Sequence, residues 1–409
     1  MRLPLSIAAL VFGSIASAAP VRLNIRDYGA RPNDNRLDTG AIQQAIDDAT
    51  RRAGNGANVN VFIPRGTWDT GALHLKSRVT LQLTNGSVLR GSTNWRDYAK
   101  DGDDDGDWQD ALISAENQVN CRVVGSGVID GRDTYRPAGE EGFRGPHALR
   151  LVNVRNPRIA NVTIRNAGNY AMFAYECRNI QVHKVKVRGG HDGLHVQDCD
   201  RIKITRSDFR TGDDCVAGCD NTDATVTDSD FNSSTNGFRF GCEGFVMERC
   251  AITGPGEYPH LSTGNRNPKA AFMHFAPRDR NPELASGEWY LRDITVSGCQ
   301  DLFHYNYVNG LWQQGKPMHA VTIDGVMADL RDGGVFVRPA PGFFMAISNG
   351  IINAATGSPH PIINVDNYRW VILNNLDFAG RSSGPLVRLR WGGRTDIDNV
   401  TPADRIAVE

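Results

Sequence analysis

The stretch of sequence from residue 155 to residue 255 is built from short β-prone segments that recur at a nearly constant interval. These segments read RIANV (158–162), NIQV (179–182), RIKI (201–204), ATV (224–226) and FVM (245–247). Ile159 and Ile180 are 21 residues apart, and Ile180 and Ile202 are 22 residues apart. Asn, Gly and Asp residues, which are typical of turns, separate the segments. A fixed period of this length indicates a solenoid, in which each repeat is one turn stacked on its neighbour.

The same stretch shows no helical period, and each repeat has room for about three short strands. The sequence therefore predicts an all-β fold, a single-stranded parallel β-helix. A β-sandwich with similar strand spacing is the alternative, but a sandwich would not need to keep the register from one repeat to the next. No linker is visible, so we expect a single β-helix domain over residues 19–409.

One segment departs from the β pattern. TGAIQQAIDDA (39–49) places apolar residues on one face of a helix, at intervals of one, four, five and eight from Ala41. Asp38 or Thr39 could cap its start, and Gly54 lies just past its end. Because a solenoid must cover its terminal apolar cross-section, we interpret this segment as an N-terminal capping helix. The first turns of the solenoid are then expected at residues 59–64 and 79–83.

The chain has 45 Lys and Arg residues against 46 Asp and Glu residues. This balance argues against a nucleic-acid partner that is bound through bulk positive charge. Glycine is abundant, at 43 of 409 residues, without the period of collagen, which indicates many tight turns.

The N-terminus, MRLPLSIAALVFGSIASAAP, has the features of a signal peptide. Arg2 supplies the positive charge, a short apolar core follows, and Ala16-Ser17-Ala18 fits the small-residue rule for cleavage. The apolar stretch is shorter than a spanning helix requires. We therefore expect residues 1–18 to be removed and the protein to be secreted or periplasmic, with no membrane partner.

Eight cysteines suit an exported protein, and disulfide bonds are expected, although their pairing is open. No Cys-x-x-Cys pair points to zinc. The acidic stretch at residues 101–107 resembles the start of a calcium loop, but Leu112 stands where an EF-hand needs glutamate. We expect neither a metal nor a cofactor.

Three carboxylates fall one period apart. Asp192 lies in His-Asp-Gly, and Asp213 and Asp214 lie in Gly-Asp-Asp-Cys, 21 and 22 residues later. Equivalent positions of successive turns stack about 4.8 Å apart, so these side chains are predicted to meet on one face. Adjacent residues of a strand point to opposite faces, so Asp213 and Asp214 can share a site only if the backbone bulges or turns, which Gly212 could permit.

Clustered carboxylates repel one another and raise the pKa of at least one member. The stability of a fold does not need this arrangement, whereas glycoside hydrolysis uses it, with one protonated and one ionised carboxyl group. The alternative, that these residues only make turn hydrogen bonds, does not explain the spacing.

These motifs carry a resemblance to a known family. HDGLHVQD (191–198) followed by GDDCVA (212–217) resembles the polygalacturonases of glycoside hydrolase family 28, as do NIRDYGA (24–30) and GSGVIDG (125–131). The resemblance covers roughly residues 21–255. It implies a right-handed β-helix and an inverting hydrolase without a cofactor. By position, it implies that Asp213 is the general acid and that Asp192 and Asp214 hold and activate the water.

The sequence also departs from the family pattern. Asn236 replaces a family histidine that supports the catalytic carboxylates, and Gly190-His191 replace Asn-Thr. The Arg-Ile-Lys motif, which grips the uronate carboxylate in the family, is missing from its expected place near residues 270–275. The RIK at residues 201–203 precedes the acidic motif, and we interpret it as coincidence. The candidate substrate-binding residues are His191, His195, Asn236 and Arg239.

Three functional classes remain open from the sequence. The first is a secreted glycoside hydrolase acting on a pectin-like or related polysaccharide as a monomer. The second is a polysaccharide lyase on the same fold, and the third is a non-catalytic carbohydrate-binding β-helix. Six aromatic residues could stack on sugar rings at the rim of a cleft: Trp108, Tyr135, Trp289, Tyr305, Tyr307 and Trp312.

Overall fold

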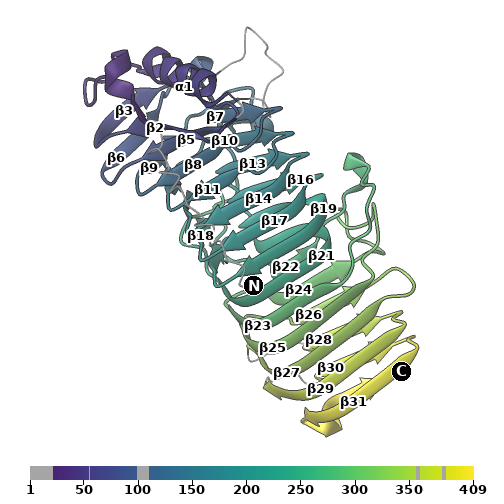
Figure 1. Cartoon of the computed structure of the whole chain (residues 1–409). Helices are drawn as coiled ribbons and strands as arrows, with labels where there is room; N and C mark the ends of the chain where they lie inside the picture. The colour runs from purple at the N-terminus through teal and green to yellow at the C-terminus, as the bar shows by residue number, and fades with distance from the viewer. Residues whose placement is uncertain (1–21, 55, 99–109, 356–359, 380–383) are drawn as a thin grey trace, which may run out of the picture.

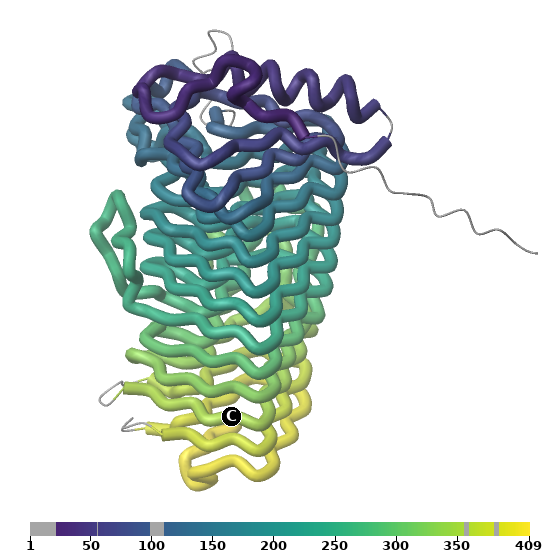
Figure 2. The backbone as a smooth tube through the Cα atoms, turned by 60° about the vertical axis from the view of Figure 1, so that its left-hand side comes forward, coloured from purple at the N-terminus to yellow at the C-terminus, as the bar shows by residue number. Residues whose placement is uncertain are grey.

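The computed structural model describes residues 22–54, 56–98, 110–355, 360–379 and 384–409. These residues coil into a right-handed parallel β-helix whose turns stack along a single axis (Figures 1 and 2). The predicted all-β solenoid is confirmed. The predicted signal peptide, Trp108 and the acidic stretch at 101–107 lie outside the described residues.

Parallel pairing arranges the strands in three columns along the solenoid. The first column contains β1 (Arg22–Asn24), β2 (Val59–Ile63), β5 (Val79–Leu83), β8 (Arg122–Gly125), β11 (Arg158–Ala160), β14 (Arg178–His183), β17 (Asp200–Thr205), β19 (Val216–Thr227), β21 (Asn236–Thr253), β23 (Trp289–Ser297), β25 (Ala320–Leu330), β27 (Phe344–Ala354), β29 (Trp370–Ala379) and β31 (Arg394–Thr401). The second contains β3 (Gly66–Thr70), β6 (Ser87–Gly91), β9 (Val128–Asp130), β12 (Thr163–Arg165), β15 (Lys186–Gly189), β18 (Asp208–Thr211) and β20 (Asp230–Ser233).

The third column contains β4 (Leu73–His74), β7 (Ala111–Glu116), β10 (His147–Val152), β13 (Met172–Tyr175), β16 (Leu194–Gln197), β22 (Ala270–His274), β24 (Asp301–Asn306), β26 (Val335–Arg338), β28 (Ile363–Asp366), β30 (Val387–Arg390) and β32 (Ile406–Val408). The starts of β19 and β21 also belong to this column, because they pair with β16 and β22. The end of β21 continues the second column by pairing with β20.

The predicted β segments fall on β11, β14, β17, β19 and β21, but the register differs at one step. Ile180 pairs with Ile202, as the period of 22 predicts. Ile159 pairs with Val182 instead of Ile180, so this turn is 23 residues long. Buried apolar side chains stack at these positions from turn to turn and fill the interior, and their burial is the main source of stability in such a fold.

The predicted capping helix is confirmed as α1 (Thr39–Ala53), which lies across the N-terminal end of the solenoid (Figure 1). Its buried face includes Ile42 and Ile46. Asp38 precedes the helix but makes no side-chain cap bond, because its Oδ1 accepts from the backbone of Arg31 instead.

Within the described ranges, five short 3-10 helices lie outside the columns: η1 (Ile25–Tyr28), η2 (Trp95–Asp97), η3 (Glu140–Gly142), η4 (Arg278–Arg280) and η5 (Ala403–Arg405). The connection from β9 to β10 contains η3, and the connection from β22 to β23 contains η4. The connection from β21 to β22 (residues 254–269) runs back along the side of the solenoid toward earlier turns (Figure 2). Each of these three connections carries a residue that reaches the carboxylate-bearing turns: Arg144, His260 and Arg280.

The expectation of disulfide bonds is wrong for this structure, because all eight cysteines are free and buried. Cys177 and Cys199 illustrate this. Their side chains point into the interior of successive turns, and the backbone N–H of Cys177 donates to Sγ of Cys199. These cysteines therefore act as small apolar core residues.

No helix in the described ranges is long and apolar enough to cross a membrane.

Candidate active site

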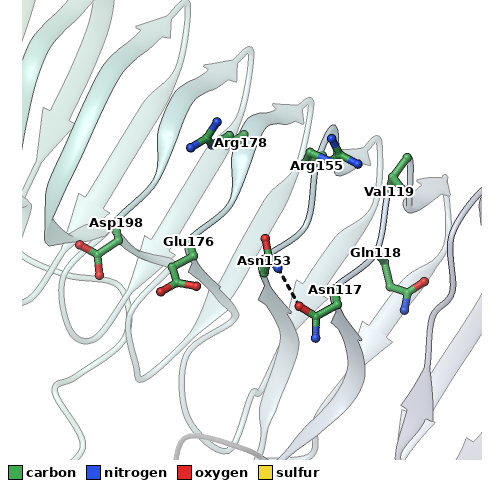
Figure 3. A pocket seen from close by; sticks show the side chains of 8 residues that line it. All are labelled: Asn117, Gln118, Val119, Asn153, Arg155, Glu176, Arg178 and Asp198. Carbon is green, nitrogen blue, oxygen red and sulfur yellow. Dashed lines mark hydrogen bonds between the residues drawn. The ribbon is translucent and has the colours of Figure 1, made fainter.

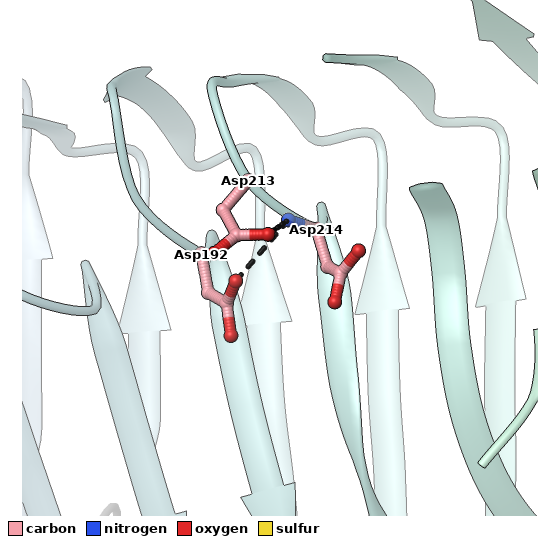
Figure 4. A group of neighbouring side chains, drawn as sticks. All are labelled: Asp192, Asp213 and Asp214. Carbon is pink, nitrogen blue, oxygen red and sulfur yellow. Dashed lines mark hydrogen bonds between the residues drawn. The ribbon is translucent and has the colours of Figure 1, made fainter. Parts of the chain in front are cut away.

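Three carboxylates meet where the second column turns into the third. Asp192 lies between β15 and β16, and Asp213 and Asp214 lie one turn later, between β18 and β19. The pairing of Leu194 with Val216 places Asp192 beside Asp214. The three side chains lie side by side (Figure 4), and one oxygen of each lies within 4.8 Å of the others. The prediction that the period brings these residues together is confirmed.

Asp213 and Asp214 belong to a turn, because β18 ends at Thr211 and β19 begins at Val216. Strand alternation therefore does not separate them, and no bulge is needed. The backbone N–H of Asp214 lies 3.1 Å from Oδ1 of Asp192 and 3.1 Å from Oδ1 of Asp213. This one donor holds two carboxylates toward each other.

His195, on β16, contacts the carboxylate of Asp192. Its Nδ1 lies 3.1 Å from Oδ2 of Asp192, and its Nε2 lies 3.1 Å from Nη1 of Arg280. Because a guanidinium group can only donate, Nε2 must be the acceptor, so Nδ1 carries the proton and donates to Asp192. Burial, followed by the charges of Arg280 and Arg239, lowers the pKa of His195 well below its usual value. His195 is therefore a neutral donor to Asp192.

Asn236 and Arg239 contact Asp214 from the next turn. Nδ2 of Asn236 donates to Oδ1 of Asp214 at 2.8 Å. Nε of Arg239 lies 2.7 Å from Oδ2 of Asp214, but its N–H is not aligned with this oxygen, so the contact is an ion pair without a good hydrogen bond. The guanidinium of Arg239 lies over the ring of Phe275 at 4.5 Å and near that of Trp312 at 5.9 Å. Two predicted site residues thus reach the cluster.

Asp213 has two partners that the sequence did not reveal. Nη2 of Arg144 donates to its Oδ2 at 2.9 Å, and Nε2 of His260 lies 3.5 Å from the same oxygen. The second distance is too long for a hydrogen bond and is a charge contact. Arg144 comes from the β9–β10 connection and His260 from the β21–β22 connection. Neither lies in a repeat, so no periodicity could have placed them here.

Two glycines let the β21–β22 connection pack against the turns that carry the carboxylates. A Cβ on Gly190 would lie 2.5 Å from Cγ of Leu261, and a Cβ on Gly212 would lie 2.2 Å from the carbonyl oxygen of Pro259. Gly212 therefore serves close approach of another backbone. These contacts position His260 over Asp213.

The environments of the three carboxylates differ, so their pKa values separate. Burial raises the pKa of Asp192 well above its usual value, and the charges of Asp213 and Asp214 raise it further. Burial raises the pKa of Asp214 to about 6, against the opposing charge of Arg239. Burial would also raise the pKa of Asp213, but His260 and Arg144 outweigh it and bring this pKa below its usual value. These shifts favour an ionised Asp213 and a proton that is retained by the Asp192–Asp214 pair in the free protein.

His191 lies beside the cluster without a hydrogen bond to it among the contacts described. Its ring stacks on Phe143 with centroids 5.8 Å apart. Burial, with a contribution from Arg144, lowers its pKa to about 3, so it is neutral.

Of the predicted rim aromatics within the described ranges, Trp289 and Tyr305 are fully buried, whereas Trp312 is 43% exposed. Tyr135 is also exposed, at 54%, but Trp312 lies 5.9 Å from the guanidinium of Arg239, which contacts Asp214.

Other polar groups lie elsewhere. Arg201 and Lys203 belong to the first column, on β17, so the RIK sequence is unrelated to the cluster. A hollow of about 500 Å³ is lined by residues of turns and strands that do not include the three carboxylates (Figure 3). Its lining residues are Asn117, Gln118, Val119, Asn153, Arg155, Glu176, Arg178 and Asp198.

The three carboxylates are close enough to hold a metal ion together. However, Arg144 and Arg239 already place positive charge against Asp213 and Asp214. These guanidinium groups thus already neutralise the carboxylates that a metal ion would need as ligands.

Residues 54–246, which contain the three carboxylates, match the family described as "Glycosyl hydrolases family 28". An exo-poly-alpha-D-galacturonosidase of Dickeya chrysanthemi is 28% identical over 269 residues, which cover 49% of this chain and 42% of that protein. The chain spans about half the length of the curated relatives that it matches.

Two solved structures share the fold. A family 28 exopolygalacturonase of Yersinia enterocolitica gives a TM-score of 0.65 at 18% identity and covers 94% of this chain and 79% of its own. An exopolygalacturonase of Thermotoga maritima gives 0.66 at 15% identity and covers 88% and 91%. The resemblance carried by the motifs is confirmed for the part of the chain that holds the three carboxylates: residues 54–246 match glycosyl hydrolases family 28, and the relatives named here are polygalacturonases.

Proposed function

We propose that this chain is a secreted glycoside hydrolase that cleaves a pectin-type polysaccharide by general acid–base catalysis. The observation that carries the proposal is the cluster of Asp192, Asp213 and Asp214, three buried carboxylates with separated pKa values on adjacent turns. The relatives named above, which include an exo-poly-alpha-D-galacturonosidase, support pectin as the substrate. The predicted signal peptide supports secretion.

Asp213 is assigned as the general acid. Its side chain is 12% exposed, whereas that of Asp214 is fully buried, so Asp213 is the carboxylate that a sugar reaches first. Asp213 is ionised in the free protein and must take up a proton before it can donate one. The Asp192–Asp214 pair holds that proton nearby. Transfer to Asp213 leaves the pair ionised and able to accept a proton from water.

The charge around the cluster supports an acidic polysaccharide. Arg144, Arg239 and Arg280 contact the carboxylates or His195. These guanidinium groups are balanced in the free protein by the ionised carboxylates of the cluster and by Glu141, which also contacts Arg144. A carboxylate of the substrate can compete for the same guanidinium groups, which a neutral sugar cannot do.

We propose an inverting reaction, with the water held between Asp192 and Asp214. Both of these carboxylates are fixed by hydrogen bonds, from His195 and from Asn236. Oxygens within 4.8 Å are closer than the 6.5–9.5 Å separation of carboxyl groups usual for inversion, so the stereochemistry needs a direct measurement. NMR of the first product from polygalacturonate identifies its anomer: the inverted anomer supports the proposal and the retained anomer contradicts it.

The activity itself is tested by incubating the purified protein with polygalacturonate, esterified pectin and neutral polysaccharides. New reducing ends from the acidic substrates are expected. Ultraviolet-absorbing unsaturated products would instead identify a lyase. Carbohydrate binding without any new ends would identify a non-catalytic protein.

A further inference from the structure

Arg144 is a buried cation that is shared between two carboxylates. Its Nη2 lies 2.9 Å from Oδ2 of Asp213 and 3.0 Å from Oε1 of Glu141. Its Nη1 donates to Oδ1 of Asn169 at 3.3 Å. Among the described residues, its Nε–H has no hydrogen-bond partner, although it is buried. The guanidinium group therefore has a donor to spare on the edge that a carboxylate engages with Nε and Nη2 together.

The side chain of Glu141 lies between the guanidinium group of Arg144 and the solvent. The side chain of Glu141 is 39% exposed, whereas that of Arg144 is 4% exposed. Glu141 also has φ of +56°, in the left-handed region that residues with a Cβ rarely adopt. Because the side chain of Glu141 is partly exposed, solvent screens its ion pair with Arg144, and another carboxylate can compete for the guanidinium group.

His260 faces the same oxygen of Asp213 from the opposite connection. Its Nδ1 contacts the hydroxyl groups of Ser262 and Thr263 at 3.0 and 3.2 Å, which directs Nε2 toward Asp213. The 3.5 Å gap between Nε2 and Oδ2 leaves this nitrogen without a tight partner. The charged and titratable groups that act on His260 are Asp213, Glu141, Arg144 and His191.

We propose that Arg144 and His260 together bind a carboxylate group of the substrate, in a place that Glu141 occupies in the free protein. This inference rests on the proposed function and names the chemical group recognised: the carboxylate of a uronic acid unit beside the cleaved bond. Arg144 and His260 would then supply the positive charge that the missing Arg-Ile-Lys motif does not provide in this chain.

The exchange links recognition to catalysis. Arg144 and His260 hold Asp213 in its ionised form. The substrate carboxylate replaces that of Glu141, so the number of negative neighbours of Asp213 does not change. It also engages His260, which then compensates the charge of Asp213 less, and this change favours uptake by Asp213 of the proton from the Asp192–Asp214 pair. An acidic substrate would therefore prepare the general acid by binding.

Isothermal titration calorimetry tests the inference with two matched ligands, trigalacturonate and its fully methyl-esterified form, which lacks the charges. All proteins carry Asp192→Asn, so that cleavage does not interfere. At pH 5, Glu141→Gln is expected to bind trigalacturonate about 5-fold more tightly, because the competing carboxylate is removed. His260→Gln is expected to bind it about 5-fold more weakly. Neither change should alter binding of the ester.

The pH profile gives a second readout. Contact with Asp213 raises the pKa of His260, so affinity for trigalacturonate should fall as pH rises from 5 to 8, and His260→Gln should remove this dependence. Glu257→Gln is the charge-matched control, because Glu257 lies near His260 in the chain but pairs with Arg210.

If Glu141→Gln behaves like Glu257→Gln and the pH dependence survives in His260→Gln, the inference is overturned even if the wild-type protein hydrolyses pectin. If the affinities change as expected while the wild-type protein releases no reducing ends, the carboxylate site stands and the hydrolase proposal fails.

Discussion

Nη2 of Arg144 lies 2.9 Å from Oδ2 of Asp213, although 69 residues separate them in the chain. The β9–β10 connection crosses several turns of the solenoid to make this contact. As a result, the most exposed of the three carboxylates is the one held in its ionised form, and the two deeper ones retain a proton.

Asp213→Asn is expected to lower the turnover of polygalacturonate by about 10²–10⁴-fold, because the variant cannot transfer a proton to the leaving oxygen. Reducing-end assays measure the loss, and thermal unfolding checks that the fold remains. Asp198→Asn, a matched change in the hollow of Figure 3, should retain wild-type turnover. Unchanged turnover in Asp213→Asn would remove its acid role.

Asp214→Asn is expected to become more stable relative to wild type as pH rises from 4 to 8. The pKa of Asp214 is raised by burial to about 6, from 3.8, so the folded wild type binds a proton more tightly than the unfolded chain. Its stability therefore falls as pH rises past the unfolded pKa and on through the folded one. Asn mimics the protonated form and avoids this loss of about 2 kcal/mol. Chemical denaturation at the two pH values measures the difference, and a constant difference would contradict the shift.

Gly212→Ala is expected to destabilise the protein by about 1–3 kcal/mol, because the added Cβ would meet the backbone of Pro259 at 2.2 Å. Activity should fall as well, since the displaced connection carries His260. Gly40→Ala is the control: its Cβ would meet nothing within 4 Å, near the start of α1. Thermal unfolding of both variants measures the difference in stability. Equal stabilities would show that the backbone of Pro259 does not pack tightly against Gly212.

Trp312→Ala is expected to raise KM by about 5-fold with little change in kcat, since a stacked sugar contributes roughly 1 kcal/mol. Trp312 lies 5.9 Å from the guanidinium of Arg239, which contacts Asp214. Trp391→Ala is the matched control. Trp391 is also exposed and its ring lies 4.5 Å from the guanidinium of Arg390, but it follows β30 near the C-terminal end of the solenoid. A similar KM for both variants would argue against a sugar platform at Trp312.

The apolar face of residues 39–49 predicted the capping helix. The period of the sequence was sufficient to predict the solenoid and the meeting of Asp192 with Asp213 and Asp214. Each depends on a local rule repeated along the chain: inward apolar residues, turn residues between them, and one turn per 22 residues or so. Asn236 and Arg239 were also within reach, because they lie one further turn along the same column.

The rest was decided by tertiary structure. Arg144 and His260 reach Asp213 from connections that follow no period, and Gly190 and Gly212 matter because another backbone approaches them. The separation of the three pKa values depends on burial and on charges that arrive from these distant connections. A repeating sequence fixes which residues share a face, because backbone pairing transmits its period. It cannot fix what the long connections bring to that face, because their path depends on packing against the finished solenoid.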